Sequence, residues 1–464
     1  MPISSAKHSI AVLPFVDLSP AKDHEYLCDG IAETLINALS GIKDLHIPAR
    51  TSAFSFKAKD IDIREIGQKL NVETLLEGSV QVAGDRLRIS ARLSNVDDGY
   101  QLWSESYERG LDDVFAVQDD IALKIVKALK IELLDEKETQ IVIRYTEDTE
   151  AYQLYLKGRY FWNRRTEDGF KKAIDYLEQA IEKDPSYALA YAGLADCYNM
   201  LGNYGYLMPK EAYPKAKEAA KKALEIDDTL AEAHASLAWA LMDYDWDWEG
   251  AEREFKKAIE LNPGYATGHQ WYAFYLIRIG RHDDSMAEIR LAKELDPLSL
   301  VINRNVGTLL FCVRQYDQAI EALQNTLEMD ASFSYTHHYL GRAYLQKFMY
   351  EEAMAEFQAE MLLEHSDADQ IFCGIIKERM GKKGEVQRML DDRIKQSEKE
   401  YVPPYYIAWL YLVLGKNDQG FKWLDKAVKE RDSELFYLKT DPRLDPIRSD
   451  PRFKALLKKV GLDK

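Results

Sequence analysis

The first third of the chain alternates between short apolar runs and helical spacing, which predicts strands interleaved with helices. Residues 10–15 form an almost continuous apolar run, as a strand buried on both faces does, and residues 86–96 alternate apolar and polar side chains, as a half-buried strand does. The predicted strands and helices cover residues 10–15, 29–39, 45–48, 63–70, 74–82, 86–96, 100–107 and 117–134. Their order is β-α-β-α-β-β-β-α, which predicts an N-terminal α/β domain.

From about residue 150 onward the pattern changes to long amphipathic helices that repeat. Pro263, Pro297, Ala331 and His365 stand at successive steps of 34 residues, each after the second helix of a predicted pair. A period of 34 is that of the tetratricopeptide repeat, in which two antiparallel helices form one unit and successive units stack. The sequence therefore predicts an all-α tetratricopeptide superhelical solenoid with seven or eight helix pairs.

Small residues recur where two paired helices would cross closely, and a large residue follows in the second helix. The small positions of the first helices are Gly158, Ala195, Ala238, Ala273, Gly307, Gly341 and Ala408, and those of the second helices are Ala173, Ala216, Ala251, Ser285, Ala319, Ala353 and Gly420. The residues four places further on are Leu177, Ala220, Phe255, Ile289, Leu323, Phe357 and Leu424. This regularity supports the repeat assignment.

The repeats depart from the pattern in three places. Residues 202–214 hold about nine extra residues, rich in Gly, Tyr and Pro, which predict a loop. Residues 366–398 keep helical content but lose the signature, so we expect a degenerate repeat there. Residues 438–462 predict a terminal cap that shields the last repeat from water. We divide the chain into an N-terminal domain, residues 1–140, and a solenoid with its cap, residues 141–464.

Composition narrows the classes of function. The chain has 464 residues and a formal net charge of -17, so it has no overall cationic field for phosphate backbones, and we expect no nucleic acid partner. No run approaches the roughly 20 apolar residues that a bilayer crossing needs, and residues 1–9 lack the apolar core of a secretory signal. The cysteines, at positions 28, 197, 312 and 373, are too far apart for a disulfide framework or zinc site, so we expect them to be reduced and buried.

Several ungapped blocks resemble the TolB amino-terminal-like domain that precedes tetratricopeptide repeats in many bacterial proteins. The blocks are SIAVLPF, YLCDGIAETLINAL, ARTSAFSFK, DIREIGQKLNVETLLEGSV and GYQLWSESYER, at residues 9–15, 26–39, 49–57, 62–80 and 99–109. The closing residues 437–462 are also similar to the usual end of that family. In that family this architecture is often fused to a class III nucleotide cyclase, a serine/threonine kinase or a winged-helix DNA-binding domain, none of which is present in these residues.

Motifs for catalysis or metal binding are absent from the sequence. Neither GxxxxGK[ST] nor GxGxxG occurs, so neither standard phosphate-binding loop is available, and HExxH is absent. The pair His337-His338 would point about 100° apart on a helix, which does not suit one metal ion. We therefore expect no catalytic residues, no metal and no cofactor, and a protein that is not an enzyme.

Binding is better supported, because the first helix of each repeat lines the concave groove of such a solenoid. Helical spacing from the small residue places aromatic and basic side chains in this groove. The predicted partner-binding residues are Tyr155, Arg159, Trp162, Trp239, Phe274, Arg278, Arg304, His338 and Arg342. Aromatic anchors with Arg favour a protein or peptide partner that carries apolar and acidic side chains. In an alternative interpretation, Trp239, Phe274 and Tyr335 only fill the interior of the superhelix.

The sequence thus predicts a non-catalytic scaffold or adaptor that binds a partner peptide in the solenoid groove. The alternative is the regulatory or sensor portion of a signalling protein, a cyclase, kinase or transcription regulator, without its output domain. We expect a cytoplasmic location, or a periplasmic or other extracytoplasmic one if the region belongs to a longer, membrane-anchored chain. The partner, any ligand of the first domain and the oligomeric state are not specified by these residues.

Overall fold

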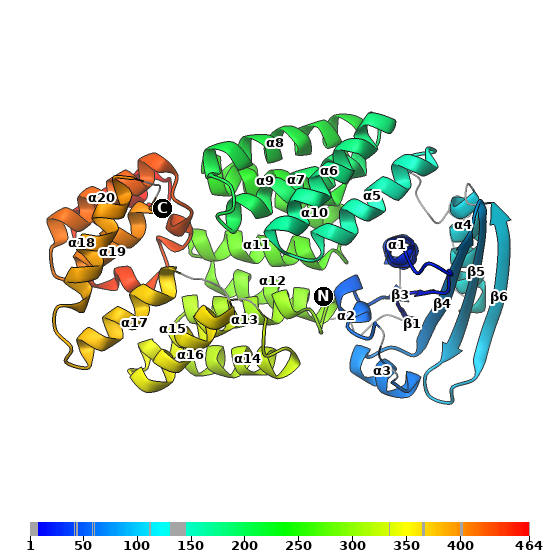
Figure 1. The fold of residues 1–464 in the computed structure, drawn as a ribbon, viewed down its shortest axis with the longest axis horizontal. Coiled ribbons are helices and arrows are strands. Elements are labelled where there is room, and N and C mark those ends of the chain that lie inside the picture. The colour runs from blue at the N-terminus through cyan, green and yellow to red at the C-terminus, as the bar shows by residue number, and fades with distance from the viewer. Residues whose placement is uncertain are drawn as a thin grey trace.

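The computed structural model describes residues 8–40, 42, 45–57, 59, 61–110, 113–129, 145–333, 335–363, 367–399 and 402–463. A small mixed sheet with its helices is followed by a long run of paired helices, so the predicted fold class is confirmed (Figure 1). We call residues 8–129 the sheet domain, residues 149–430 the solenoid and residues 433–463 the C-terminal segment. No helix in the described part of the chain is both long enough and apolar enough to span a membrane.

The sheet domain contains one six-stranded sheet, in which β1 pairs in parallel with β3 and β4, and β4, β5 and β6 are antiparallel neighbours. Strand β2 pairs with β4 beyond β1. Its elements are β1 (His8–Val12), β2 (Val16–Asp17), α1 (Glu25–Ser40), β3 (Leu45–His46), α2 (Arg50–Phe54), α3 (Ile63–Leu70), β4 (Thr74–Ala83), β5 (Arg86–Asn95), β6 (Gln101–Gly110) and α4 (Val114–Ala128).

Alternation along β1 buries both faces of this strand, as its apolar run predicts. Ile10 and Val12 face the core formed with α1 and α4, whereas Ala11 and Leu13 face α3 on the opposite side. Helix α3 begins after Asp62, whose side chain accepts a hydrogen bond from the Arg64 backbone N–H, as expected for an N-cap. Helix α1 begins four residues earlier than predicted, and residues 130–134 of the last predicted helix lie outside the described residues.

The solenoid consists of eight helix pairs in the described residues. The pairs are α5 (Thr149–Trp162) with α6 (Glu167–Lys183), α7 (Ala188–Asn203) with α8 (Pro209–Ile226), α9 (Ala231–Ala240) with α10 (Trp248–Leu261), α11 (Ala266–Ile279) with α12 (His282–Leu295), α13 (Leu300–Cys312) with α14 (Tyr316–Met329), α15 (Thr336–Gln346) with α16 (Tyr350–Leu363), α17 (Asp367–Arg379) with α18 (Glu385–Ser397), and α19 (Pro404–Val413) with α20 (Asn417–Glu430). One turn of π-helix, η3 (Leu241–Asp245), extends α9.

The paired helices approach so closely at their crossing points that some positions require glycine. A Cβ atom at Gly158 would lie 2.7 Å from Leu177, and one at Gly307 would lie 2.5 Å from Leu323. These are the small and large positions that the repeat pattern pairs. The loop predicted within residues 202–214 is wrong in extent, because α7 continues to Asn203 and α8 starts at Pro209. Proline is well tolerated at this first helical position, where no intrahelical N–H bond is lost.

A polar bridge recurs at the start of the first helix in several repeats. The imidazoles of His234, His269 and His337 each contact a backbone carbonyl six residues earlier and a glutamate of the following helix, with nitrogen to carboxylate distances of 2.5–2.7 Å. Asn303, which occupies this position in the fifth repeat, donates to the Pro297 carbonyl at 2.8 Å. These histidines therefore join the two helices of a repeat, and His337 has a different carboxylate neighbour from His338.

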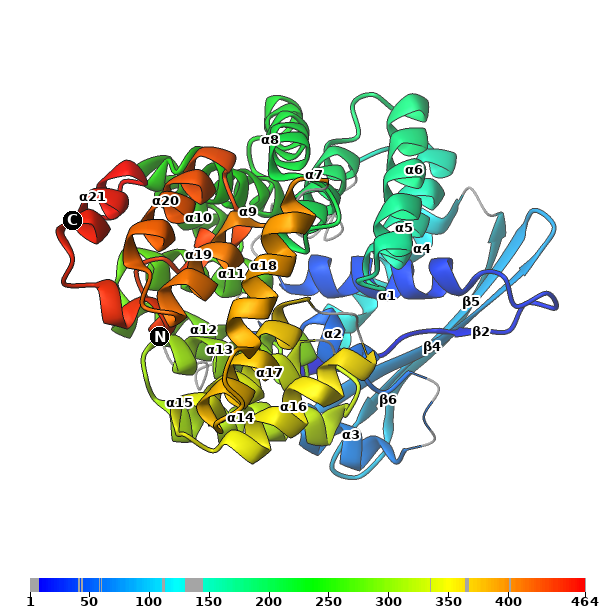
Figure 2. The same cartoon turned by 60° about the vertical axis from the view of Figure 1, so that its left-hand side comes forward.

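The sheet domain packs directly on the first repeat (Figures 1 and 2). Helix α1 contacts the sheet on one side and α5 on the other, and Leu156 of α5 fills the space above Gly30. A second contact joins two residues that are 244 positions apart in the sequence: the Ser52 backbone N–H donates to the Asp296 carboxylate at 2.8 Å. Two separate contacts thus fix the sheet domain against the first and fourth repeats.

The C-terminal segment does more than shield the last repeat. It comprises the 3-10 turns η4 (Ser433–Tyr437) and η5 (Pro442–Ile447) and the helix α21 (Pro451–Lys459). It packs on α20, as predicted, but it also turns back to earlier repeats: Lys439 donates to the Ile279 carbonyl at 3.0 Å, and the Trp248 indole donates to the Val460 carbonyl at 2.7 Å. The expectation of a simple end cap is therefore incomplete, because Trp246 and Trp248 of the third repeat also pack against the apolar cluster that this segment forms with α19 and α20.

Candidate binding cavity

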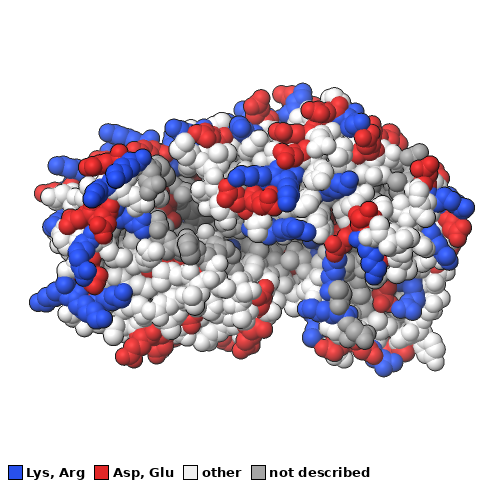
Figure 3. Space-filling view, in the orientation of Figure 1, with Lys and Arg blue, Asp and Glu red and all other residues white. Residues whose placement is uncertain are grey.

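A cavity of about 590 Å³ lies inside the curve of the solenoid. Its walls come mainly from the first helices α9, α11, α13 and α15, with single residues or pairs from α7, α17 and α19. The sheet domain contributes α2, and the C-terminal segment contributes η4. The face seen in Figure 3 is hollowed near its middle, where uncharged residues predominate, and charged side chains gather around the rim. The groove expected of an open solenoid is therefore partly enclosed by the two ends of the chain.

The cavity lining carries more positive than negative side chains, although the chain as a whole has a net charge of -17. Its guanidinium groups belong to Arg50, Arg165, Arg304 and Arg342, and its carboxylates to Asp296 and Glu434. Both carboxylates already have partners, since Asp296 accepts from Ser52 and Glu434 accepts from the Tyr406 hydroxyl at 2.8 Å. The side chains of the lining therefore have a net positive charge, in contrast to the whole chain, although Arg50 is paired with Glu33 at 3.0 Å.

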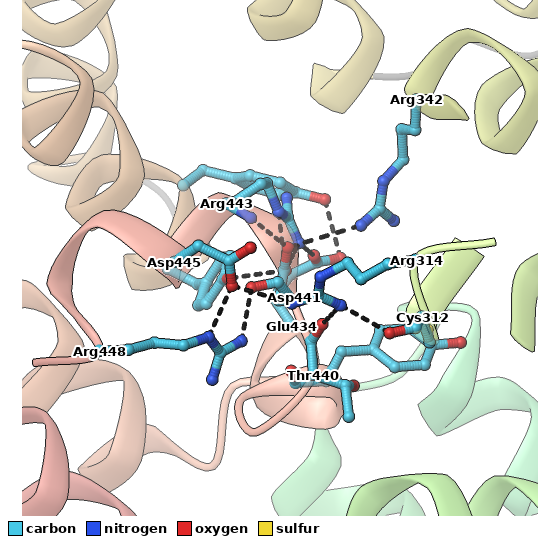
Figure 4. Close-up of polar contacts among 12 residues, drawn as sticks. Cys312, Arg314, Arg342, Glu434, Thr440, Asp441, Arg443, Asp445 and Arg448 are labelled. Carbon is cyan, nitrogen blue, oxygen red and sulfur yellow. Dashed lines mark hydrogen bonds and ion pairs between the residues drawn. The ribbon is translucent and has the colours of Figure 1, made fainter. Parts of the chain in front are cut away.

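Arg342 is the most deeply buried of these arginines, with 5% of its surface exposed. Its one ion pair with a described residue is long, 3.7 Å from Nη2 to Asp441, and Asp441 is held more closely by Arg443 at 2.7 Å (Figure 4). The rings of Phe311 and Tyr339 lie 4.7 and 5.4 Å from its guanidinium carbon. The buried Nε of Arg342 has no hydrogen-bond partner among the described residues, so this guanidinium is incompletely satisfied within the protein.

Arg165 reaches the cavity from the turn after α5. Its guanidinium lies 3.6 Å from the centre of the Trp162 ring, and it forms no ion pair with any residue that the structure describes. Its backbone is held in the left-handed region, with φ of 55°, which is uncommon for a residue with a side chain. Burial lowers the pKa of Arg165 from its ordinary value, as expected for a cation placed away from water.

Aromatic rings and side-chain amides form much of the remaining wall. Trp239 packs on Trp271 with ring centres 5.0 Å apart and on Phe274 at 6.4 Å, and Tyr335 packs near Tyr204 at 6.1 Å. The amides in the lining are those of Asn163, Asn203, Gln270 and Asn305. Such a wall offers flat apolar surface together with donors and acceptors, as small-molecule pockets do.

Five of the nine predicted partner-binding residues line this cavity: Trp239, Phe274, Arg304, His338 and Arg342. His338 is engaged by Asp369, with Nδ1 to Oδ1 at 2.6 Å, and Arg304 lies 3.2 Å from the Asn305 side-chain oxygen. That these five residues contact a ligand stays a prediction. They line one cavity because they occupy groove-facing positions on the first helices of successive repeats.

The other four predicted residues serve internal contacts in the structure. Tyr155 packs on Tyr187, Arg159 forms ion pairs with Glu33 at 3.4 Å and Asp196 at 3.3 Å, and Trp162 lies between two arginines. Arg278 is 2% exposed and forms an ion pair with Asp243. The sheet domain covers the start of the groove, and η3 brings Asp243 to Arg278, so none of the four lines the cavity.

Sequence reasoning missed the contributions from the chain ends. Arg50 and Thr51 come from α2, whose five residues show no apolar periodicity, and Glu434 and Tyr437 come from a turn that was expected only to cover the last repeat. Arg165 lies outside the helical positions from which the groove was predicted. The one available signal was the basic pair Arg164-Arg165 between two amphipathic helices.

Asp296, which joins α2 of the sheet domain to the end of α12, is expected to make the stability of the fold depend on pH. Burial raises its pKa to about 6, although the hydrogen bonds from Ser52 act in the opposite direction. An acid with a raised pKa in the folded state stabilises the fold more at low pH, and this contribution is lost as the pH rises through 6. The free energy of unfolding of the wild type should therefore fall between pH 5 and pH 8, whereas that of Asp296→Asn should not fall for this reason. We expect the difference between variant and wild type to shift by about 1 kcal/mol in favour of the variant, measured by urea unfolding at both pH values. An equal difference at the two pH values would contradict this assignment.

The described residues contain no group of three or more His, Cys, Asp or Glu side chains arranged to hold a metal ion. All four cysteines are free and buried, as predicted, and burial raises the pKa of the Cys28 thiol to about 12, which disfavours its reactive thiolate.

Comparisons with known proteins separate the two parts of the chain. Residues 6–124 match the family described as HilA/YgeH-like transcriptional regulator, second domain, and residues 155–205 match the tetratricopeptide repeat. The resemblance to a TolB amino-terminal-like domain is not among these matches, so it stays a prediction.

Curated relatives include bacterial proteins. The chain is 36% identical over 238 residues to "Putative adenylate cyclase 3" of Rhizobium meliloti (strain 1021), covering 51% of this chain and 40% of that protein. It is 24% identical over 293 residues to the transcriptional regulator HilA of Salmonella typhimurium, covering 62% of this chain and 51% of that protein. The chain thus spans about half the length, or less, of these relatives.

Solved structures are similar to the chain at low sequence identity. The human IFIT1 dimer with m7Gppp-AAAA is 14% identical with a TM-score of 0.42, covering 68% of this chain and 77% of that chain. Pseudomonas aeruginosa pilF is 20% identical with a TM-score of 0.35, covering 44% and 93%. The repeat match at residues 155–205 and the paired helices assign a tetratricopeptide-repeat fold to the solenoid, and the relatives of the chain include bacterial proteins.

Proposed function

We propose that this chain is a non-catalytic regulatory module and that its central cavity is the binding site through which it acts. The observation that carries this proposal is that both α2, near one end of the described chain, and η4, near the other, contribute to the cavity wall together with the helices of the solenoid. A ligand there would contact the sheet domain, the solenoid and the C-terminal segment at once, so binding could be relayed to any of them. The regulatory relatives support this proposal.

A scaffold that binds a partner peptide is the second candidate. It is favoured by the C-terminal segment itself, whose turns η4 and η5 place the Asp441 carboxylate beside Arg342 (Figure 4). A partner segment with a carboxylate would use the same chemistry. We also propose that the sheet domain is TolB-like. The free, buried cysteines support a reducing, cytoplasmic location.

The proposal is tested by affinity capture with a cavity that is filled. Thr267 lies in the wall on α11 and is partly buried, so Thr267→Trp is expected to fill part of the cavity and to remove a bound protein or small molecule that the wild type retains. Captured components are identified by mass spectrometry, and each is tested again with the purified chain.

The matched control is Lys221→Trp, which adds the same side chain on the exposed side of α8. It is expected to retain whatever the wild type retains. If Thr267→Trp melts normally and keeps every component that the wild type and the control keep, the cavity is not the binding site.

A further inference from the structure

Two guanidinium groups of the cavity, those of Arg165 and Arg342, are incompletely paired within the part of the chain that the structure describes, whereas Arg50 is paired with Glu33 at 3.0 Å. Glu434 is shared with Arg443 at 3.3 Å, and Asp296 is occupied by the Ser52 hydrogen bonds, so neither is available to pair with Arg165 or Arg342. Burying a cation without a full set of partners is unfavourable, and the usual remedy is a bound anion or ordered water. Arg342, nearly fully buried with an unpartnered Nε, is the clearest sign of a missing partner.

The aromatic rings in the cavity wall indicate the shape of the ligand as well as its charge. Trp239, Trp271 and Phe274 form one aromatic wall, and Tyr335 stands near Tyr204 on another. Rings of this kind favour a planar group, which can stack or pack edge to face with them. The side-chain amides of Gln270 and Asn305 are placed in the lining to hydrogen-bond polar edges of such a group.

We propose that the cavity binds a small organic anion, with a planar body between the aromatic walls and one phosphate or carboxylate group held by Arg342 and Arg165. Guanidinium groups recognise both anions through paired N–H donors, so the shared chemistry is a planar oxyanion. This inference rests on the proposed function, because it names the ligand class of the same cavity.

Size and shape favour a small molecule over a long peptide. A volume of about 590 Å³ lies within the usual range of small-molecule sites, roughly 300–1,000 Å³. A peptide that followed the groove would have to pass α2 at one end and η4 at the other, where Thr51 and Tyr437 already line the space. The enclosed region therefore suits a compact ligand.

The test is titration calorimetry on the purified full chain with five probes. Adenosine 5′-monophosphate and 2-naphthoate are planar anions with a phosphate and a carboxylate, adenosine and 2-naphthamide are their neutral counterparts, and inorganic phosphate lacks a planar body. We expect at least one planar anion to bind with one site per chain and a dissociation constant below about 1 mM, at least tenfold tighter than its neutral counterpart and than inorganic phosphate. Which of the two anions binds distinguishes phosphate from carboxylate.

Two variants assign the site. Arg342→Gln and Arg165→Gln are each expected to weaken that binding by about tenfold or more, because a hydrogen bond to a charged group is lost. Arg165 forms no ion pair with a described residue, so its variant reports on binding even if Arg342→Gln unfolds. Arg290→Gln, at an exposed position on α12, is the control and is expected to bind like the wild type.

The proposal is overturned if neither planar anion binds, if neutral counterparts or inorganic phosphate bind equally well, or if Arg165→Gln binds as the wild type does. If the anion proposal fails in this way but Thr267→Trp still removes a captured protein or small molecule that the wild type retains, the proposed function stands. If Thr267→Trp changes neither capture nor anion binding, both proposals fail together.

Discussion

Replacing Asp441 with Asn is expected to lower the free energy of unfolding by about 3–5 kcal/mol, since it removes the charge that neutralises a buried arginine. Asp441 is 1% exposed and contacts Arg443 at 2.7 Å and the Tyr405 hydroxyl at 2.8 Å (Figure 4). The variant would leave Arg443 buried with only the more distant Glu434 at 3.3 Å. Urea unfolding followed by circular dichroism measures the loss.

The pH dependence of the same variant gives an independent check. Burial alone would raise the pKa of Asp441, but the charges of Arg443 and Arg342 outweigh it and hold that pKa well below its usual range. Such a group stabilises the fold above its unfolded pKa, near 3.9, and this stabilisation is lost as the pH falls toward its folded pKa. The difference between wild type and variant is therefore expected to be constant from about pH 8 to pH 5 and to shrink below about pH 4.

Asp445→Asn is the matched control in the same turn. Asp445 contacts Arg314 and Arg448 at 2.8 and 2.6 Å, but 45% of its side chain is exposed, so water screens these ion pairs. We expect a loss of about 1 kcal/mol or less. Equal losses for the two variants would show that the Asp441 network does not stabilise the fold as described.

Phe357→Ala is expected to cost about 3–5 kcal/mol of unfolding free energy through lost burial and the cavity left behind. Phe357 is fully buried, stacks on Phe372 with ring centres 4.7 Å apart, and fills the space next to Gly341. It is the large residue that the repeat pattern pairs with Gly341. Thermal and urea unfolding of the full chain measure the effect.

Phe348 provides the comparison for this substitution. It lies in the turn between α15 and α16 of the same repeat, and 71% of its surface is exposed. Phe348→Ala removes the same group of atoms and is expected to change the unfolding free energy by no more than about 0.5 kcal/mol. If both variants lost stability equally, the assignment of Phe357 to the core of the repeat would be wrong.

The repeat pattern predicted the fold of the solenoid well, because a fixed period and paired small and large residues are local features of the sequence. Gly158 with Leu177 and Gly307 with Leu323 meet as expected. In the sheet domain, the apolar run at β1 and the alternation at β5 predicted which faces are buried. Helix α2 was missed because its placement depends on a contact with Leu295 and Asp296, about 240 residues away in sequence.

The site was predicted less completely for the same reason. Helical geometry placed Trp239, Phe274, Arg304, His338 and Arg342 on the concave side, and they do line one cavity. It could not show that Arg278 would be neutralised by Asp243, or that the sheet domain would cover Arg159. The first outcome depends on the π-helical turn η3 and the second on where the sheet domain folds, and no period in the sequence encodes either position.

The return of the C-terminal segment changes how the repeats depend on one another. In an open array each repeat touches only its neighbours, so end repeats can fray and whole repeats can be added or removed. Here Trp248 of the third repeat, Ile279 of the fourth and Arg314 of the fifth all contact the last thirty or so residues. Opening any of these repeats also breaks a contact with the far end of the chain. The array therefore has a fixed length: an inserted or deleted unit would carry the C-terminal segment out of register with its partners.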